Sequence, residues 1–387
     1  MKILICCGFF ESQLPTWREY SYSANLAKMG HDVTLLCGDQ SQIWRHSRVK
    51  LTPTEPALMD DQFVRTTGVR LIRHHVFLRV SDFVLFRPSL RAIRDADIVH
   101  CIEFRQGITM LVALLAWMMG KPVVYDHEQR GDRDARWYSR VDSRFRRMLI
   151  AIGSVTVKAV RHTVLANRDH WRSATLKKGV REMFAPLGAD PAIFYMDAAE
   201  RAQTRAELGL ADGEKAAIVS GKLHGEKRIP SVVAACRRAG LRLILVGAMP
   251  DDVRRAIESL PPGDEIILAN VDTNGLRRLY NAADIVIFTT FTLSYWEAMA
   301  TGLFLVAPRT SFTELAIEGQ RNVALFGDES LFALSDERYH PHVDVEPPLT
   351  AALQAIELPV REANLVYSAP VQTEKLAALY AELLGKG

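Results

Sequence analysis

Residues 284–315 constrain the fold more than any other part of the chain, because several secondary-structure elements follow one another there in a readable order. The sequence is DIVIFTTFTLSYWEAMATGLFLVAPRTSFTEL. Residues 284–288 and 303–307 are apolar runs of the length of buried parallel strands. Residues 295–301 form an expected short helix that stops at Gly302. A strand, a helix and a second strand in this order predict a parallel sheet with helices on its faces.

The start of that helix is a candidate nucleotide site. Helix N-termini carry unsatisfied N–H groups and the positive end of a dipole, so they can hold a phosphate. Glu297 lies in the first turn, where a carboxylate can accept two hydrogen bonds from a vicinal diol such as a ribose. Parallel α/β sheets hold nucleotides in this way. A plainer interpretation of Glu297 is an acid that favours the helix dipole.

A second phosphate-type loop favours the nucleotide interpretation. Residues 221–228 read GKLHGEKR and follow the expected strand 216–220. The two glycines permit a tight turn, and Lys222 and Lys227 place two ammonium groups at a strand-to-helix loop. Two lysines could neutralise a diphosphate without a metal. The alternative is a pair of solvated surface lysines.

Length and composition exclude several classes of protein. The 387 residues are too many for one ordinary core and suit two. A net charge of +3 does not argue for a nucleic-acid partner. The five cysteines are scattered without metal-type spacing, so we expect no metal site and reduced thiols in a cytosolic protein. No signal peptide is visible, and the apolar run 108–119 is too short to cross a bilayer, so it fits a buried helix.

Two successive strand–helix series predict an α/β protein of two Rossmann-like, doubly wound domains that face each other across a cleft. We place the first domain at 1–195, joined by a C-terminal helix at 370–387, and the second at 196–369. Expected strands of the first series are 2–7, 31–36, 69–73, 97–102, 122–125 and 163–166. Those of the second series are 216–220, 241–246, 265–268, 284–288 and 303–307.

The first domain contains two candidate sites and one candidate surface. Gly8 ends the first strand, where such sheets bind ligands. Residues 126–133 follow the strand 122–125 and are rich in acidic, basic and imidazole groups. We favour a function for His127, directly after the strand, and expect solvated arginines. The basic helical stretch 138–161 could lie on anionic lipid; the alternative is an ordinary surface helix.

At this point the chain resembles the GT-B-fold retaining glycosyltransferases of family 4. The motifs lie in the family's order and span most of the chain, and they are specific as a set. The similar segments are Gly30-His31-Asp32-Val33, Asp97-Ile98-Val99-His100, Gly188-Ala189-Asp190 with Phe194, Gly221-Lys222-Leu223 with Lys227, Gly247, residues 279–285 (LYNAADI) and residues 297–302 (EAMATG).

The resemblance implies roles for individual residues. Lys222 and Lys227 would bind the diphosphate of a nucleotide sugar, and Glu297 would bind the ribose hydroxyls. The amides of Leu293, Ser294 and Tyr295 would cap the distal phosphate.

Further roles follow from the same resemblance. His127 matches a strand-end histidine that contacts the donor sugar near the reacting carbon, and it is the candidate catalytic residue. The Gly8 loop would close over phosphate or acceptor, and we place Asn270 among the donor-binding residues. Thr289 stands where the family's E-x7-E motif has its first glutamate, which contacts the transferred sugar. A threonine is shorter and uncharged, and it both donates and accepts hydrogen bonds.

These observations predict a metal-independent, cofactor-free retaining glycosyltransferase. It would move a sugar from a nucleoside diphosphate sugar, UDP- or GDP-linked, to a hydroxyl of a glycan, a lipid-linked molecule or a small molecule. Cell-surface glycan, glycolipid or natural-product glycoside synthesis is the expected setting. We expect a cytoplasmic protein that contacts the inner face of the membrane peripherally. Two alternatives stay open: a nucleotide-sugar epimerase or hydrolase on the same fold, and a non-catalytic nucleotide-sugar-binding subunit.

Overall fold

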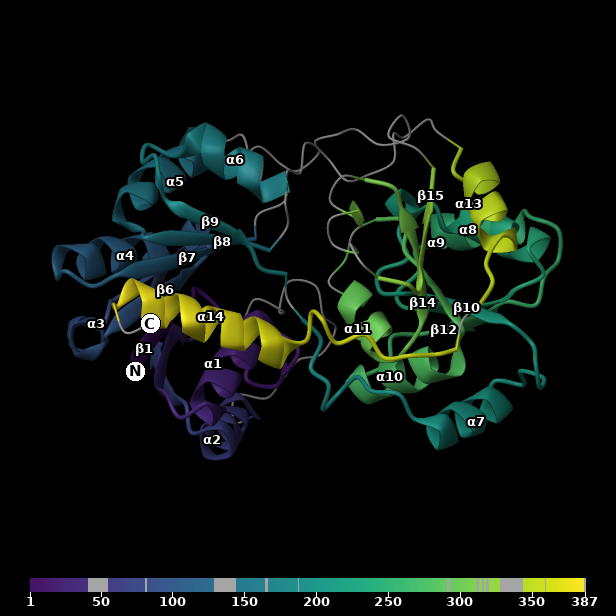
Figure 1. The fold of residues 1–387 in the computed structure, drawn as a ribbon, viewed down its shortest axis with the longest axis horizontal. Helices are drawn as coiled ribbons and strands as arrows, with labels where there is room; N and C mark the ends of the chain where they lie inside the picture. Colours follow the sequence, from purple (N-terminus) through teal and green to yellow (C-terminus); the bar gives the residue numbers. More distant parts are fainter. Residues whose placement is uncertain are drawn as a thin grey trace. The chain divides into compact units, whose positions relative to one another are not determined.

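The computed structural model describes residues 1–40, 55–80, 82–128, 144–163, 166–186, 188–290, 292, 294–310, 313–314, 317, 320–327, 344–358 and 360–385. The chain forms two compact units (Figure 1). The first is Met1–Leu187 with Ala369–Gly387, and the second is Gly188–Ser368. The sequence placed the junction at 195/196. Each unit has a parallel sheet with covering helices, which confirms the predicted class of two Rossmann-like units.

The first unit is built on a seven-stranded sheet of order β3-β2-β1-β6-β7-β8-β9. Its strands are all parallel, with Ile3 of β1 opposite Val33 of β2 and Ile98 of β6. Their bounds are β1 (Lys2–Cys6), β2 (Asp32–Gly38), β3 (Arg70–His74), β6 (Ile98–Ile102), β7 (Val123–His127), β8 (Ala159–His162) and β9 (Arg181–Phe184). The central strands are buried on both faces, which is why they read as continuous apolar runs.

Helices cover both faces of this sheet, and Figure 1 shows α4 and α5 on the side away from α1 and α14. The helices are α1 (Arg18–Lys28), α2 (Glu55–Thr67), α3 (Leu90–Asp95), α4 (Ile108–Met118), α5 (Arg144–Thr156), α6 (Ala166–Ala174) and α14 (Ala369–Leu383). A hairpin of β4 (Val76–Val80) and β5 (Phe83–Phe86) completes the unit. Within the described ranges, every helix is too short or too polar to span a bilayer.

The prediction of a helix reaching residue 161 is wrong. The helix α5 ends at Thr156, and Ala159–His162 form the strand β8. The charge of Arg161 concealed this strand from sequence reasoning. In the structure Arg161 is buried and pairs with Asp126 of the neighbouring strand, with Nη1 at 3.1 Å from Oδ1. Residues 138–143 lie outside the described ranges.

The second unit is built on a six-stranded parallel sheet of order β12-β11-β10-β13-β14-β15. Its strands are β10 (Ala216–Ser220), β11 (Arg242–Val246), β12 (Ile266–Leu268), β13 (Ile285–Ile287), β14 (Phe304–Pro308) and β15 (Val323–Phe326). Its helices are α7 (Ala198–Glu207), η3 (Gly225–Lys227), α8 (Ile229–Arg238), α9 (Asp251–Glu258), α10 (Thr273–Ala282), α11 (Ser294–Ala300) and α13 (Glu346–Gln354). The core between the sheet and α8, α9 and α13 is apolar.

Arginine side chains cap the C-terminal end of α10. The guanidinium of Arg361 donates at 2.7–2.9 Å to the carbonyls of Tyr280, Asn281, Ala283 and Thr301. Arg201 donates to carbonyls of the same helix end and pairs with Asp284. Cations are favourable at this end of a helix dipole. The cap therefore holds the helix that leads directly into β13.

Each sheet has one point where the strand order reverses. In the first unit the chain moves outward from β1 to β3 and then returns to place β6 on the other side of β1. In the second unit β10 and β13 are neighbours in the same way. Doubly wound sheets bind ligands beyond the carboxyl ends of the two strands at such a point. The loops after β1, β6, β10 and β13 are therefore the candidate ligand-binding loops.

Candidate functional site

Lys227 lies at the carboxyl end of β10. Its Nζ is 3.1 Å from the carbonyl oxygen of Ser220, the last residue of that strand. Gly221 has a φ of +95°, and a Cβ built there would lie 3.3 Å from the same Nζ. Lys227 is half-buried, whereas Lys222 is exposed. Of the two predicted diphosphate ligands, the structure therefore places Lys227 over the strand end and Lys222 toward solvent.

The backbone beside Lys227 requires glycine. Gly247 follows β11 with a φ of +140°, and a Cβ there would lie 1.8 Å from the carbonyl oxygen of Gly221. Any side chain would displace the loop that carries Lys227. Arg228, the next residue, adopts a φ of 51°. A non-glycine residue in this region is strained, and such strain concentrates at functional sites.

Thr289, at the position of the family's first motif glutamate, uses its hydroxyl within the protein. The side chain is 4% exposed, and Oγ1 donates to the carbonyl oxygen of Lys227 at 2.8 Å. This hydrogen bond ties the loop after β13 to the loop after β10. The side chain that we expected to touch the donor thus supports the backbone of Lys227.

A chain of hydrogen bonds connects β10 to Glu297. The Oγ of Ser220 lies 2.8 Å from the hydroxyl of Tyr280, which is fully buried. The side chain of Ser294 bonds to both Tyr280 and Glu297. When Glu297 is ionised its carboxylate only accepts, and the hydrogen bonds then run from Ser220 through Tyr280 and Ser294 to Glu297. Burial raises the pKa of the Glu297 carboxyl to about 7, and the bond from Ser294 opposes that rise.

The first amides of α11 already have acceptors. The N–H of Tyr295 donates to the carbonyl of Thr292 at 3.2 Å, and the N–H of Ser294 lies 3.4 Å from the Oγ1 of Thr292. A phosphate bound here would have to replace both contacts. Leu293, the third predicted amide donor, lies outside the described residues.

Asn270 lies apart from these groups. It is exposed and follows β12, the edge strand of the sheet. The strand β11 separates β12 from β10. The structure therefore does not bring this predicted donor-binding residue to the reversal point where Lys227 and Glu297 lie.

In the first unit, Gly8 lies two residues after the end of β1, at the reversal point. Its N–H donates to the Oε1 of Gln106 at 2.5 Å. A Cβ at Gly8 would lie 2.6 Å from the Cγ2 of Val84, so the close approach of the β4–β5 hairpin requires glycine. The predicted loop glycine is in the expected place, and its amide has a partner within the domain.

His127 is the last residue of β7, and its side chain is fully buried. Its Nε2 lies 3.1 Å from the Nδ1 of His170, and the two rings stack with centroids 5.2 Å apart. Burial lowers the pKa of His127 well below its usual value, and His162 and His170 lower it further. The predicted catalytic residue is therefore a neutral imidazole enclosed in its own domain. Residues 129–143, which follow it, lie outside the described residues.

Sequence reasoning missed Glu103, which directly follows β6 at the reversal point. Its φ is 59°. Among the described residues, Arg228 is the only other non-glycine residue with a positive φ. The carboxylate of Glu103 is buried, accepts from the N–H of Glu128 at 2.5 Å, and lies 3.5 Å from Nε of Arg105. Burial raises the pKa of Glu103. An acid directly after the expected strand 97–102 was the available signal.

A buried charge network beside His127 was also missed. The carboxylate of Asp126 lies 2.9 Å from Nε2 of His100 and 3.1 Å from Nη1 of Arg161. Although burial opposes ionisation, Arg161 and His100 hold the pKa of Asp126 well below its usual range. Arg161 also donates to the hydroxyl of Tyr22, and Nδ1 of His100 bonds to the hydroxyl of Tyr380. The network therefore attaches α1 and α14 to the sheet.

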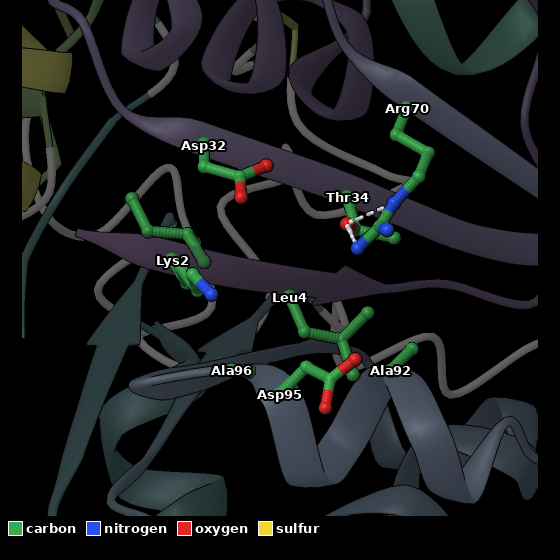
Figure 2. Close-up of a pocket in the computed structure, with 9 residues that line it drawn as sticks. Lys2, Leu4, Asp32, Thr34, Arg70, Ala92, Asp95 and Ala96 are labelled. Atoms are coloured by element: carbon green, nitrogen blue, oxygen red, sulfur yellow. Dashed lines mark hydrogen bonds between the residues drawn. The ribbon is translucent and has the colours of Figure 1, made fainter.

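Figure 2 shows a pocket of about 70 Å³ at the other end of the first sheet. Lys2 and Asp32, at the amino ends of β1 and β2, line it together with Thr34, Arg70 and Asp95. Arg70 donates twice to the Oγ1 of Thr34, at 2.9 and 2.7 Å. This pocket lies away from the carboxyl ends of the strands and carries balanced charge, so we do not assign the ligand site to it.

Comparison with known proteins agrees with this geometry. Residues 219–337 match the family model described as glycosyl transferases group 1, and this segment contains Lys227, Thr289 and Glu297. No curated sequence matches the chain.

Solved structures share the fold over the whole chain at low sequence identity. Sucrose-phosphate synthase from Thermosynechococcus elongatus is 17% identical, with a TM-score of 0.60 and 100% of both chains covered. Anabaena HepE in complex with UDP and glucose is 12% identical, with a TM-score of 0.63, covering 99% of this chain and 100% of that one. A glycosyltransferase from Rickettsia africae is 13% identical, with a TM-score of 0.65, covering 100% and 99%. Residues 219–337 of the second unit are therefore similar to the glycosyl transferases group 1 family, and the chain has the two-unit Rossmann-like fold that these GT-B structures share.

Proposed function

We propose that this protein is a retaining glycosyltransferase of the family 4 type, which moves a sugar from a nucleoside diphosphate sugar to a hydroxyl acceptor. One observation carries the proposal: an ammonium and a carboxyl group lie beyond the two neighbouring strands at the reversal point of the second sheet. The ammonium of Lys227 can pair with a diphosphate, and the carboxyl group of Glu297 can hydrogen-bond to the hydroxyls of a ribose. Support also comes from HepE, whose solved structures hold UDP, glucose and UDP-glucose.

In the proposed reaction, the bond between the anomeric carbon and the diphosphate oxygen breaks, and the diphosphate leaves with the bonding electrons. Lys227 stabilises the charge that develops on the leaving group. The acceptor hydroxyl attacks the anomeric carbon from the face that the diphosphate leaves, so the configuration is retained. Its proton passes to an oxygen of the leaving phosphate. Water must be excluded, because it competes with the acceptor.

Several finer roles stay proposals. We propose that no metal is needed, because Lys227 already brings positive charge to the diphosphate; undiminished transfer in a chelating buffer is the expected result. His127 would orient the donor sugar, which requires its ring to leave His170. We propose the amide of Leu293 as a further donor contact. For Asn270, which follows the edge strand β12, we propose contact with a part of the donor away from the groups that Lys227 and Glu297 would bind. We also propose a cytoplasmic protein and an acceptor from cell-surface glycan, glycolipid or natural-product glycoside synthesis.

The buried hydroxyl of Thr289 favours one alternative function. In the family, an acid at this motif position contacts the sugar, whereas this chain has Thr289 there. The Thr289 hydroxyl is hydrogen-bonded to the carbonyl oxygen of Lys227. A subunit that binds a nucleotide sugar without transferring it would have this arrangement. An assay must therefore separate binding from turnover.

The test begins with thermal-shift screening against uridine, guanosine and adenosine diphosphate sugars. A ligand at about 100 times its Kd stabilises the fold by about 2.7 kcal/mol, which identifies the donor base. Nucleotide release is then measured with and without acceptors, and the anomeric configuration of the product is determined by NMR. Release that needs an acceptor, with retained configuration, supports the proposal. Release without acceptor indicates hydrolysis, and binding without release indicates the non-catalytic subunit; either result refutes it.

A further inference from the structure

The helix α5 exposes an apolar stripe to solvent. Phe145, Met148, Ile152 and Val155 are 49%, 47%, 40% and 41% exposed. At 3.6 residues per turn these positions fall within an arc of about 80°. The opposite side of the helix, which includes Ile150, packs on the core of the first unit. One apolar side of α5 therefore serves the fold. On the other side, Phe145 makes an edge contact with the ring of Phe83, at 5.5 Å between centroids, and Met148, Ile152 and Val155 stay exposed.

The neighbouring helix α4 adds to this surface. The apolar run 108–119 predicts a buried helix, but Trp117 and Met118 at the C-terminal end of α4 are 48% and 69% exposed. The helices α4 and α5 contact each other and cover the same side of the sheet (Figure 1). Leu176 is 69% exposed, and its N–H donates to the Oγ of Ser154 on α5. Exposed apolar groups gathered on adjoining segments mark an interaction surface, whereas single ones do not.

The charge around this surface is positive. Arg144 and Arg147 of α5 are exposed, as are Lys158, which follows α5, and Lys178, which follows α6. Neither α4 nor α5 contains an acidic residue. Glu182 of the neighbouring strand β9 is paired with Arg172. Basic side chains beside an apolar stripe suit an anionic partner, whereas a second copy of this chain would bring like charges together.

We propose that the exposed side of α4 and α5 docks on the surface of a bilayer that contains anionic phospholipid. Met148, Ile152 and their neighbours would enter the boundary between headgroups and acyl chains, as the apolar side of an interfacial helix does. The arginines and lysines would lie among the lipid phosphates, which attract basic segments at the membrane surface. This surface belongs to the first unit and the donor site to the second, and the proposal does not depend on the enzymatic activity.

The test is sedimentation of the full-length protein with vesicles of phosphatidylcholine alone or of phosphatidylcholine with phosphatidylglycerol. We expect binding to the anionic vesicles only, weakened by salt. Met148→Ser with Ile152→Ser should lower the affinity by about tenfold or more. Lys158→Ala should weaken it by about fivefold. The matched control is Leu58→Ser on α2, which is 68% exposed and packs with α1 and β3.

A second measurement locates the contact without removing apolar groups. The five native cysteines are buried, so a fluorophore on Met148→Cys or Leu58→Cys labels one exposed site. We expect a blue shift with anionic vesicles for the label at 148 and none for the label at 58. Equal vesicle binding by the serine double variant would overturn the proposal. So would a dimer, seen by light scattering, that the same substitutions dissociate while vesicles are not bound.

Discussion

Lys222 and Lys227 belong to the same loop, and replacing each with methionine tests whether their different surroundings have functional consequences. Methionine keeps the apolar stem and removes the charge. Lys227 is half-buried, with its Nζ 3.1 Å from the carbonyl oxygen of Ser220, while Lys222 is exposed. If the end of β10 holds the diphosphate, the two substitutions should differ greatly in their effect on transfer.

The expected magnitudes follow from the two environments. A positioned group that stabilises developing charge in a partly dehydrated site contributes about 2.7–4 kcal/mol, or roughly 10²–10³ in kcat. An exposed charge contributes about 1 kcal/mol or less, or about fivefold. Lys227→Met should therefore reduce turnover at least roughly 20-fold more than Lys222→Met. The loss of the hydrogen bond to Ser220 should cost only about 1 kcal/mol of folding stability.

The assay measures kcat and the donor KM for both variants, with urea unfolding to verify the fold. Calorimetric titration with the nucleoside diphosphate separates loss of binding from loss of turnover. A role for Lys227 in holding the diphosphate is refuted if Lys222→Met is as damaging as Lys227→Met, or if Lys227→Met retains a near-normal rate. A fall of several kcal/mol in the free energy of unfolding would instead identify Lys227 as a structural residue.

Three further predictions concern the surroundings of the site. Thr289→Val removes the hydrogen bond to the carbonyl oxygen of Lys227, so it should lower the free energy of unfolding by about 1 kcal/mol and raise the donor KM. Unchanged kinetics would contradict the supporting role of Thr289. The folded-state pKa of Glu297, about 7, lies above its ordinary value of 4.5, so ionisation opposes folding. Without ligand, stability should fall on the order of 3 kcal/mol as pH rises between these values, and urea unfolding of Glu297→Gln should lack that loss. Arg361→Met should lower the free energy of unfolding by about 1–3 kcal/mol, because the carbonyls of Tyr280 and Thr301 lose this donor while those of Asn281 and Ala283 keep Arg201; a change below about 0.5 kcal/mol would exclude the capping role.

Most of the architecture can be predicted from the order of residues alone. Buried parallel strands must be short apolar runs, and helices between them must carry an apolar side. Both series of strands and helices can therefore be identified in the sequence. It also located the loops at the strand ends, including the turn that Gly221 opens. These features depend on local backbone geometry, which neighbouring residues in the chain control.

What the side chains in those loops do became clear from the folded structure. It directs Lys227 over the strand end and leaves Lys222 in solvent, it uses the hydroxyl of Thr289 to hold a carbonyl, and it encloses His127 beside His170. It also places Glu103 at the reversal point of the first sheet. The direction of a side chain, its hydrogen-bond partner and the cost of its charge depend on groups far away in sequence. Those groups become neighbours only when the strands assemble into a sheet.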